Sequence, residues 1–334
     1  MKIFITGVAG FLGSHLADLM ISEGHTVAGN DNMIGGYTDN VPQNVEFYQI
    51  DCCDLENMTK AMQDCDIVYH TAATAYEGLS VFSPVLVTKN IFEASVTTIT
   101  AAIRNKVKRI VYCSSMARYG HHDVLPYKET YECHPQDPYG IAKKAGEDVL
   151  KNLCETHGVE YVIAVPHNIV GPRQKYDDPF RNVMSIMLNR MLQGKQPIIY
   201  GDGEQQRCFS YIDDCLYCLN ALAFQDNVVG EVINIGPDEE PITINKLAEA
   251  CANETGLNLD PIHYKDRPKE VKLAICSSDK ARDLLGYRTA TNTIQSIKKT
   301  AEYIRTRGTK KFQYHLPLEI INDHTPETWK KKLI

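Results

Sequence analysis

The amino-acid sequence predicts an α/β protein, a doubly wound parallel sheet followed by a smaller C-terminal α/β lobe. Three observations support this fold class. In the first half of the chain, short apolar runs alternate with helically spaced apolar residues. A glycine-rich turn separates the first apolar run from the first helix, and turns become frequent after about Gly171. Strands that alternate with helices are typical of βαβ units, whose parallel sheet is covered on both faces.

Apolar periodicity gives the positions of the expected elements. Short apolar runs predict six strands, at residues 2–6, 26–29, 45–50, 66–71, 109–113 and 160–165. Helical spacing of apolar residues predicts helices at residues 11–23, 84–105 and 139–157. Beyond residue 171 the expected elements are shorter and more scattered.

This change of rhythm predicts two domains. Residues 1–171 are expected to form the first domain, and residues 172–334 a second lobe with a C-terminal tail. A later segment, about 207–236, is expected to interleave with the first domain. The length of 334 residues agrees with two domains of roughly 150 residues each or with one large α/β unit. The tail, residues 310–334, holds the only tryptophan, Trp329, and is expected to wrap over the surface.

Composition and charge argue against several classes of protein. The formal net charge is −7 without a basic block, so neither nucleic acid nor a membrane is expected as a partner. No apolar run approaches the roughly 18 residues of a membrane span, and the N-terminus does not resemble a signal peptide. The eleven cysteines lack regular spacing, which is typical of reduced, buried thiols and predicts a cytoplasmic protein.

Two sequence patterns are better explained by a structural role than by a metal-binding or catalytic one. Cys215 and Cys218 form a C-x-x-C pair in an apolar helical stretch with no second pair nearby. Because a structural zinc site usually needs four ligands, buried thiols are the favoured interpretation and no metal is predicted. His121 and His122 are expected to be exposed loop histidines.

The glycine-rich turn predicts a dinucleotide site. Gly7, Gly10 and Gly13 lie between the first strand and the first helix, where the backbone can approach a pyrophosphate at the helix N-terminus. Asp31, followed by Asn32, comes about 20 residues later, at the end of the second strand. A carboxylate there accepts hydrogen bonds from a ribose 2′-hydroxyl and repels a 2′-phosphate. The sequence therefore predicts NAD as the cofactor.

Two further strand ends could contact the same cofactor. Asp51 and Cys52 follow the third strand, where an adenine edge could lie. Thr71, Ala72 and Ala73 end the fourth strand with small residues, as close approach to a cofactor requires. Taken singly, each segment is equally consistent with packing.

A tyrosine, a lysine and a serine form the candidate catalytic group. Tyr139 and Lys143 are four residues apart, so they share one face of the expected helix. A lysine ammonium and a nicotinamide cation would favour the tyrosinate, which could act as a general base towards a sugar hydroxyl. Ser114 and Ser115 end the fifth strand, and active-site groups of open α/β sheets lie at the carboxyl ends of strands. Ser115 could relay the proton to Tyr139; without the rest of the pattern, a turn serine would be favoured.

Taken together, the motifs resemble the extended short-chain dehydrogenase/reductases, specifically nucleotide-sugar epimerases of the UDP-galactose 4-epimerase type. The resemblance covers nearly the whole chain. It is carried by residues 7–13 (GVAGFLG), 31–32 (DN), 114–120 (SSMARYG), 139–143 (YGIAK), 166–172 (PHNIVGP), 201–214 (GDGEQQRCFSYIDD) and 267–270 (RPKE).

The resemblance implies a Rossmann domain that binds NAD and a lobe that binds a nucleotide sugar. Tyr139 would be the base, Lys143 its electrostatic partner and a ribose ligand, and Ser115 the proton relay. The implied cofactor contacts are Gly7, Gly10, Phe11, Leu12, Gly13, Asp31, Asn32, Asp51, Cys52, Thr71, Ala72, Ala73, Asn90, Tyr139, Lys143 and Pro166. The implied substrate contacts are Ser115, Asn168, Arg207, Arg267 and Glu270, with the two arginines on the diphosphate.

Departures from the family pattern narrow the range of reactions that the protein could catalyse. Dehydratases of this superfamily typically carry an Asp-Glu pair after the active-site serine or threonine, and decarboxylases keep the second acid, but here Met116 and Ala117 follow Ser115. Arg118 stands where valine is usual, Val165 where arginine is common, and Ala75 replaces a polar residue sometimes found near the sugar. These changes leave the identity of the sugar open.

The resulting prediction is an NAD-dependent epimerase acting at C4 of a UDP-hexose through a transient 4-keto sugar. The alternatives are a C2 epimerase, or a 4-dehydrogenase or reductase, of a GDP-, CDP- or UDP-linked sugar, including a heptose or deoxysugar. A dinucleotide-binding sensor without catalysis is disfavoured by the intact Ser115, Tyr139 and Lys143. The helices at 84–105 and 139–157 resemble the family's dimer-forming pair, which implies a homodimer with a four-helix interface.

Overall fold

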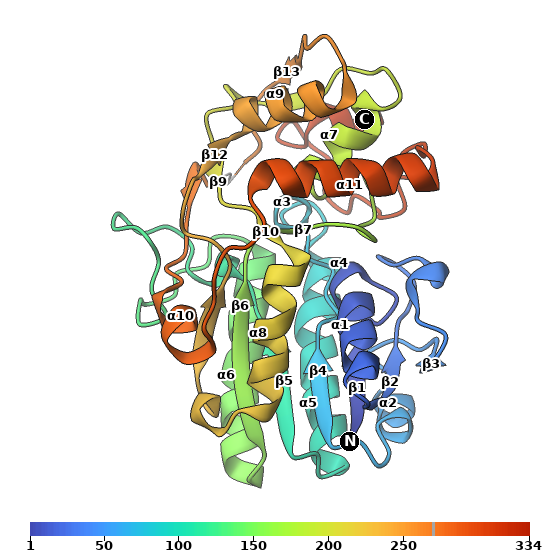
Figure 1. Ribbon diagram of the computed structural model, residues 1–334, viewed down its shortest axis with the longest axis vertical. Helices are drawn as coiled ribbons and strands as arrows, with labels where there is room; N and C mark the ends of the chain where they lie inside the picture. Colours follow the sequence, from blue (N-terminus) through green and yellow to red (C-terminus); the bar gives the residue numbers. More distant parts are fainter. Residues whose placement is uncertain (269–270) are drawn as a thin grey trace.

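A seven-stranded parallel sheet forms the centre of the protein (Figure 1). The computed structural model describes residues 1–268 and 271–334. The strand order is β11-β6-β5-β4-β1-β2-β3, and all neighbours are parallel. The strands are β1 (Lys2–Thr6), β2 (Thr26–Asn30), β3 (Val45–Tyr48), β4 (Ile67–His70), β5 (Arg109–Cys113), β6 (Glu160–Pro166) and β11 (Val232–Ile235). The predicted fold class is confirmed, and β1 and β5 have the predicted bounds.

Helices cover both faces of the sheet, each over its own apolar core. In β1, Phe4 faces one core while Ile3 and Ile5 face the other, as the alternation of side chains along a strand requires. One face carries α1 (Phe11–Ser22) and α8 (Ile212–Phe224), and the opposite face carries α2 (Leu55–Ala61), α5 (Ala94–Arg104) and α6 (Pro138–His157). Cys215 and Cys218 are buried free thiols of α8, as predicted.

The helix predicted at residues 84–105 is not uniform. It begins as α4 (Pro84–Thr88), widens into the π-helical turn η2 (Lys89–Glu93) and continues as α5. Single π-helical turns inside α-helices frequently occur at functional sites. Asn90 lies in this turn, and its amide donates a hydrogen bond of 3.0 Å to the Thr74 hydroxyl.

The smaller lobe lies across the carboxyl ends of the strands, at the top of Figure 1. Its core is formed by α7 (Val183–Met191), α9 (Ile244–Thr255) and α11 (Thr293–Arg307). Short strands join distant segments: β7 (Ile169–Val170) with β10 (Ser210–Tyr211), β8 (Ile198–Tyr200) with β13 (Ile262–Tyr264), and β9 (Gln206–Arg207) with β12 (Ile242–Thr243) and β14 (Leu273–Ala274). The remaining elements are α3 (Glu77–Ser80), α10 (Asp279–Leu285), α12 (Glu327–Lys330), η1 (Thr38–Asn40), η3 (Met116–Arg118) and η4 (Asp226–Val228).

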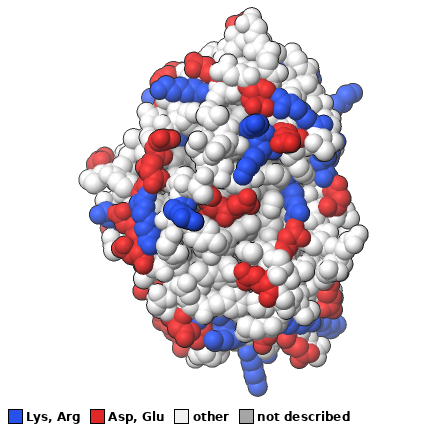
Figure 2. All heavy atoms as spheres, in the orientation of Figure 1, with Lys and Arg blue, Asp and Glu red and all other residues white. Residues whose placement is uncertain are grey.

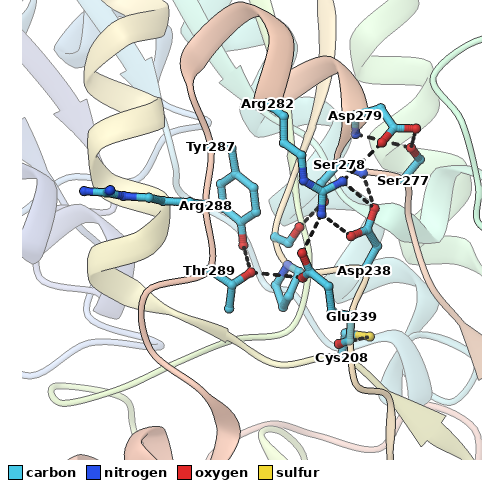
Figure 3. Close-up of polar contacts among 12 residues, drawn as sticks. Cys208, Asp238, Glu239, Ser277, Ser278, Asp279, Arg282, Tyr287, Arg288 and Thr289 are labelled. Carbon is cyan, nitrogen blue, oxygen red and sulfur yellow. Dashed lines mark hydrogen bonds and ion pairs between the residues drawn. The ribbon is translucent and has the colours of Figure 1, made fainter.

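Late segments of the chain complete the sheet. β11 pairs with β6, and Asn234 in β11 accepts a hydrogen bond of 2.8 Å from the Tyr119 hydroxyl. Figure 3 shows how α10 is tied to the loop after β11: Arg282 donates to the carboxylates of Asp238 and Glu239. The division into domains at residue 171 remains a prediction.

The C-terminal tail lies over the lobe, and its Trp329 is 2% exposed because it packs into an apolar cluster with Phe82 and Phe180. One expectation about the surface needs correction. His121 is exposed as expected, whereas His122 is half-buried against the rings of Tyr127 and Tyr131, so the prediction was wrong for His122.

The surface charges are mixed in sign. On the face shown in Figure 2, acidic and basic side chains are interspersed. Within the described residues, no helix is long and apolar enough to cross a membrane.

Candidate active site

The glycine turn lies where the strand order reverses, between β1 and β4. Open α/β sheets bind ligands at such a point. Gly7 has a φ of +72°, and a Cβ on this residue would lie 2.9 Å from the Ala72 Cα after β4. The backbone N–H of Gly7 donates to the Asn30 carbonyl at 2.7 Å. The turn is therefore held against the ends of both neighbouring strands, with room for backbone alone.

The start of α1, which follows this turn, provides backbone N–H groups that can donate hydrogen bonds to a ligand. Gly10 precedes the helix and caps it with no side-chain hydrogen bond. A Cβ on Gly13 would lie 2.3 Å from the Gly7 carbonyl oxygen, so only glycine permits this close packing. Because first-turn N–H groups and the helix dipole favour anions, this cradle fits a pyrophosphate.

Acidic groups stand at the ends of β2 and β3. Asp31 is 7% exposed, and its carboxylate accepts hydrogen bonds from the backbone N–H groups of Met33 (2.7 Å) and Ala9 (3.1 Å). Burial raises the pKa of Asp31, and these backbone hydrogen bonds oppose the rise. Asn32 donates to Asp51 at 2.9 Å, which joins the two strand ends. The residues present fit the adenosine half of NAD.

A cleft of about 430 Å³ runs from this turn to the lobe. It brings together every residue predicted to contact the cofactor, and these are Gly7, Gly10, Phe11, Leu12, Gly13, Asp31, Asn32, Asp51, Cys52, Thr71, Ala72, Ala73, Asn90, Tyr139, Lys143 and Pro166. Ser115, Asn168, Arg207 and Arg267 line the same cleft. Glu270 lies outside the described residues.

Tyr139 is placed by the start of α6. Asp137 caps this helix by accepting from the Gly140 N–H at 2.8 Å, and Pro138 occupies its first turn. Ser115 caps the start of η3, where its hydroxyl accepts from the Ala117 N–H at 3.2 Å. Burial raises the pKa of Tyr139 to about 12, while Arg181 and a hydrogen bond with Ser115 oppose this rise.

Lys143 lies one turn further along α6 and is 1% exposed. Its ammonium donates to the Cys113 carbonyl at 2.7 Å, at the end of β5. Burial lowers the pKa of Lys143 to about 8. The lysine is thus fixed between α6 and the strand that precedes Ser115.

The predicted substrate residues are held by the lobe. The amide of Asn168 donates to the Cys208 carbonyl at 3.0 Å, and this residue has a φ of +45°. Arg207 donates to the Gln206 carbonyl at 2.8 Å. The Arg267 guanidinium lies over the Tyr200 ring, 4.9 Å from its centroid. The side chains of Asn168, Arg207 and Arg267 are held by these contacts as part of the cleft wall.

The sequence did not single out Tyr76, Asp178 or Arg181, which also line the cleft. Arg181 is the strongest electrostatic influence that lowers the pKa of Tyr139. Tyr76 donates a hydrogen bond to the buried carboxylate of Asp178, across the cleft wall. The only signal was a weak one: residues 177–179 (DDP) place two acids before a proline soon after the Gly171 turn.

Fold and site together define a dinucleotide-binding enzyme with a serine, a tyrosine and a lysine at one cleft. Within the described residues, no cluster of His, Cys, Asp or Glu side chains is placed to hold a metal ion. Residues 3–236 match the NAD-dependent epimerase/dehydratase family. The chain belongs to this family and is an NAD-dependent enzyme of the nucleotide-sugar epimerase type.

Similar proteins span almost the whole chain. A putative UDP-glucose 4-epimerase of Methanocaldococcus jannaschii is 32% identical, covering 92% of this chain and 99% of its own. The UDP-glucose 4-epimerase of Thermotoga maritima, solved with UDP-glucose, has a TM-score of 0.87 at 32% identity, with 92% and 99% covered. The UDP-glucuronic acid 4-epimerase of Bacillus cereus, solved with UDP-glucuronic acid and NAD, has a TM-score of 0.84 at 29% identity, with 92% and 100% covered.

Proposed function

We propose that the protein interconverts the C4 epimers of a UDP-linked hexose. The observation that carries this proposal is the convergence of Ser115, Tyr139 and Lys143 on the cleft that begins at the glycine turn. Met116 and Ala117 follow Ser115, so the acids that dehydratases and decarboxylases of the superfamily carry are missing from these positions. The names of the similar 4-epimerases support the same reaction.

The chain's own residues supply binding and proton transfer. Arg207 and Arg267 are proposed to bind the diphosphate and Asn168 the adjoining sugar. Tyr139 would take the proton of the 4-hydroxyl, directly or through Ser115, and later return it. The Lys143 ammonium would hold the cofactor ribose and favour the phenolate. The chemistry that NAD supplies when bound is reversible hydride acceptance at sugar C4, which leaves a 4-keto sugar.

A hexuronic acid is the second candidate substrate. The specific observation that favours it is Arg181, an exposed cation in the cleft wall near Tyr139. A guanidinium binds a carboxylate bidentately, and a uronic acid carries one at C6, which is joined to the reacting C4 through C5. The similar 4-epimerase of Bacillus cereus is named for UDP-glucuronic acid.

Assembly and compartment are further parts of the proposal. The segment α4–η2–α5 packs beside α6, and Val85 and Ile141 on these helices are 71% and 54% exposed. Such apolar side chains favour a homodimer with a four-helix interface, which light scattering of the wild type and Ile141→Glu would test. The eleven free cysteines favour the reducing cytoplasm.

The deciding experiment is incubation of the purified protein, without added NAD, with a panel of UDP-, GDP- and CDP-sugars that includes UDP-glucose and UDP-glucuronic acid. Conversion within one C4 pair, lost in Tyr139→Phe, is the expected result. If conversion requires added NAD and NADH accumulates, the protein is a dehydrogenase. If C2 epimers form, the reaction takes place at C2 and the proposed assignment to C4 is wrong.

A further inference from the structure

Two segments wall the cleft at the end that holds Tyr139. The first wall is residues 76–86 and the second wall is residues 177–182. Their cleft-lining residues include Tyr76, Glu77, Gly78, Asp178, Phe180 and Arg181. The hydrogen bond from Tyr76 to Asp178 joins the two walls directly.

The C-terminal segment, residues 310–334, is bonded to the first wall. The backbone N–H groups of Glu319 and Ile320 both donate to the Phe82 carbonyl at 2.9 Å. The Glu319 carboxylate accepts from Val85 N–H (2.8 Å) and Leu86 N–H (2.9 Å) in the first turn of α4. No side chain of the preceding residue caps that helix. Glu319 therefore supplies the cap from a distant part of the chain.

The same segment is bonded to the second wall. Gln313 N–H donates to the Asp177 carbonyl at 2.8 Å. The Phe180 ring meets two rings of the segment edge-on, Trp329 at 5.4 Å and Tyr314 at 5.8 Å between centroids. Edge-to-face pairs of this kind fix ring orientation.

Trp329 stands between the two walls. Its indole meets Phe82 of the first wall edge-on at 6.0 Å and Phe180 of the second wall at 5.4 Å. A Cβ on Gly78 would lie 3.5 Å from the indole, so the ring also lies against Gly78 of the first wall. The neighbouring Thr328 hydroxyl bonds the Tyr200 hydroxyl at 2.5 Å, beneath Arg267.

We propose that residues 310–334 form a strap that fixes the two walls around the sugar, and that Trp329 is the positioning residue that sets which sugar fits. The proposal rests on the proposed function for the identity of the ligand. It separates recognition of the sugar from recognition of NAD, because the contacts described for the strap lie on the two walls and none of them is with residues 7–13. Loss of Trp329 should therefore weaken recognition of the sugar and spare recognition of NAD.

Binding measurements on the NAD-loaded protein test this separation. Titrations use UDP, UDP-glucose and UDP-glucuronic acid in a Tyr139→Phe background, which prevents conversion during the experiment. Trp329→Ala should weaken the preferred UDP-sugar about tenfold, or about 1.4 kcal/mol, should weaken UDP less, and should leave NAD unchanged. Trp329→Phe, which keeps an aromatic ring between the walls, should recover most of the affinity.

A second pair of variants covers the case in which Trp329→Ala does not fold. Glu319→Gln removes the charged cap of α4 and should weaken the UDP-sugar more than UDP. Glu327→Gln is the matched control, because Glu327 lies in the strap but pairs only with Lys331 among the contacts described. Its titrations should match those of the Tyr139→Phe parent.

Fluorescence gives an independent readout, because Trp329 is the only tryptophan. Its emission should change with the preferred UDP-sugar and much less with UDP. The strap proposal is overturned if Trp329→Ala and Glu319→Gln weaken UDP and UDP-sugar equally, or if they weaken neither. Failure of the proposed function looks different: the UDP-sugar binds with strap-dependent affinity, but the wild type converts none.

Discussion

The guanidinium of Arg118 lies 2.9 Å from the carboxylate of Glu147, and both side chains are almost fully buried. Ser114, the neighbour of Ser115, donates a hydrogen bond to the same carboxylate. Glu147 follows Lys143 by one turn of α6. This buried group therefore links the end of β5 to the helix that carries Tyr139 and Lys143.

Glu147→Gln should lower the free energy of unfolding by about 3–5 kcal/mol, because the variant leaves a buried guanidinium without its counter-charge. Denaturant titration measures the loss. Asp148→Asn is the control on the same helix, since Asp148 pairs with Lys144 at the surface and exposed pairs contribute little. Equal stability of the two variants would contradict the prediction, whereas partial recovery in Arg118→Val/Glu147→Gln would support it.

Arg181→Gln should move the acidic limb of the kcat/KM pH profile to higher pH. Arg181 lowers the pKa of Tyr139, so its removal reduces the fraction of phenolate at any given pH. Arg181→Lys keeps the charge and should shift the limb less. Arg305→Gln, which breaks an exposed pair with Glu254 on the lobe, should not move it. An unmoved limb in Arg181→Gln would mean that Arg181 acts on the substrate alone.

Gly13→Ala should prevent measurable NAD binding and reduce stability by about 1–3 kcal/mol, as overpacking does. The added Cβ would lie 2.3 Å from the Gly7 carbonyl oxygen, so the turn must shift. Calorimetric titration with NAD and thermal unfolding measure the two effects. Gly35→Ala is the control in the same cleft, because a Cβ there meets nothing within 4 Å. Normal NAD affinity in Gly13→Ala would disprove the cradle.

Acid should destabilise the protein partly through His70. Burial and the nearby Lys143 lower the pKa of His70 to about 3, so the folded state holds it neutral between Thr6 and Ser95. An unfolded histidine binds a proton near pH 6.5, and therefore the free energy of unfolding falls as pH drops from about 6.5 towards 3.

The slope attributable to His70 is at most about 1.4 kcal/mol per pH unit. Denaturant titrations across this window should show a shallower slope in His70→Gln. The exposed His121→Gln should keep the slope of the wild type. A wild-type slope in His70→Gln would assign the acid sensitivity to other groups.

The sheet and the convergence of strand-end residues on one cleft could be predicted from the sequence for a shared physical reason. Buried strands such as Arg109–Cys113 are short apolar runs, and groups that follow parallel strands meet at one edge of the sheet. Asp31, Thr71 and Ser115 could therefore be brought together without coordinates.

The lobe was less predictable because its contacts are distant in the chain. Strands of two residues, such as Gln206–Arg207, have no periodicity to detect. The pairing of Tyr76 with Asp178 and the packing of Trp329 on Phe180 depend on how the loops fold back. The π-helical turn at Lys89–Glu93 could not be distinguished in the sequence from an ordinary α-helix.

The pairing of β11 with β6 has a consequence for the state of the sheet while the chain is being synthesised. β6 ends at Pro166, but its outer neighbour begins only at Val232. During synthesis from the N-terminus, β6 presents an open edge until the ribosome has added the intervening residues. An unpaired edge strand is a template for wrong association. The nascent chain therefore exposes an edge prone to aggregation while this stretch is being translated, after the glycine turn and α6 have already been made.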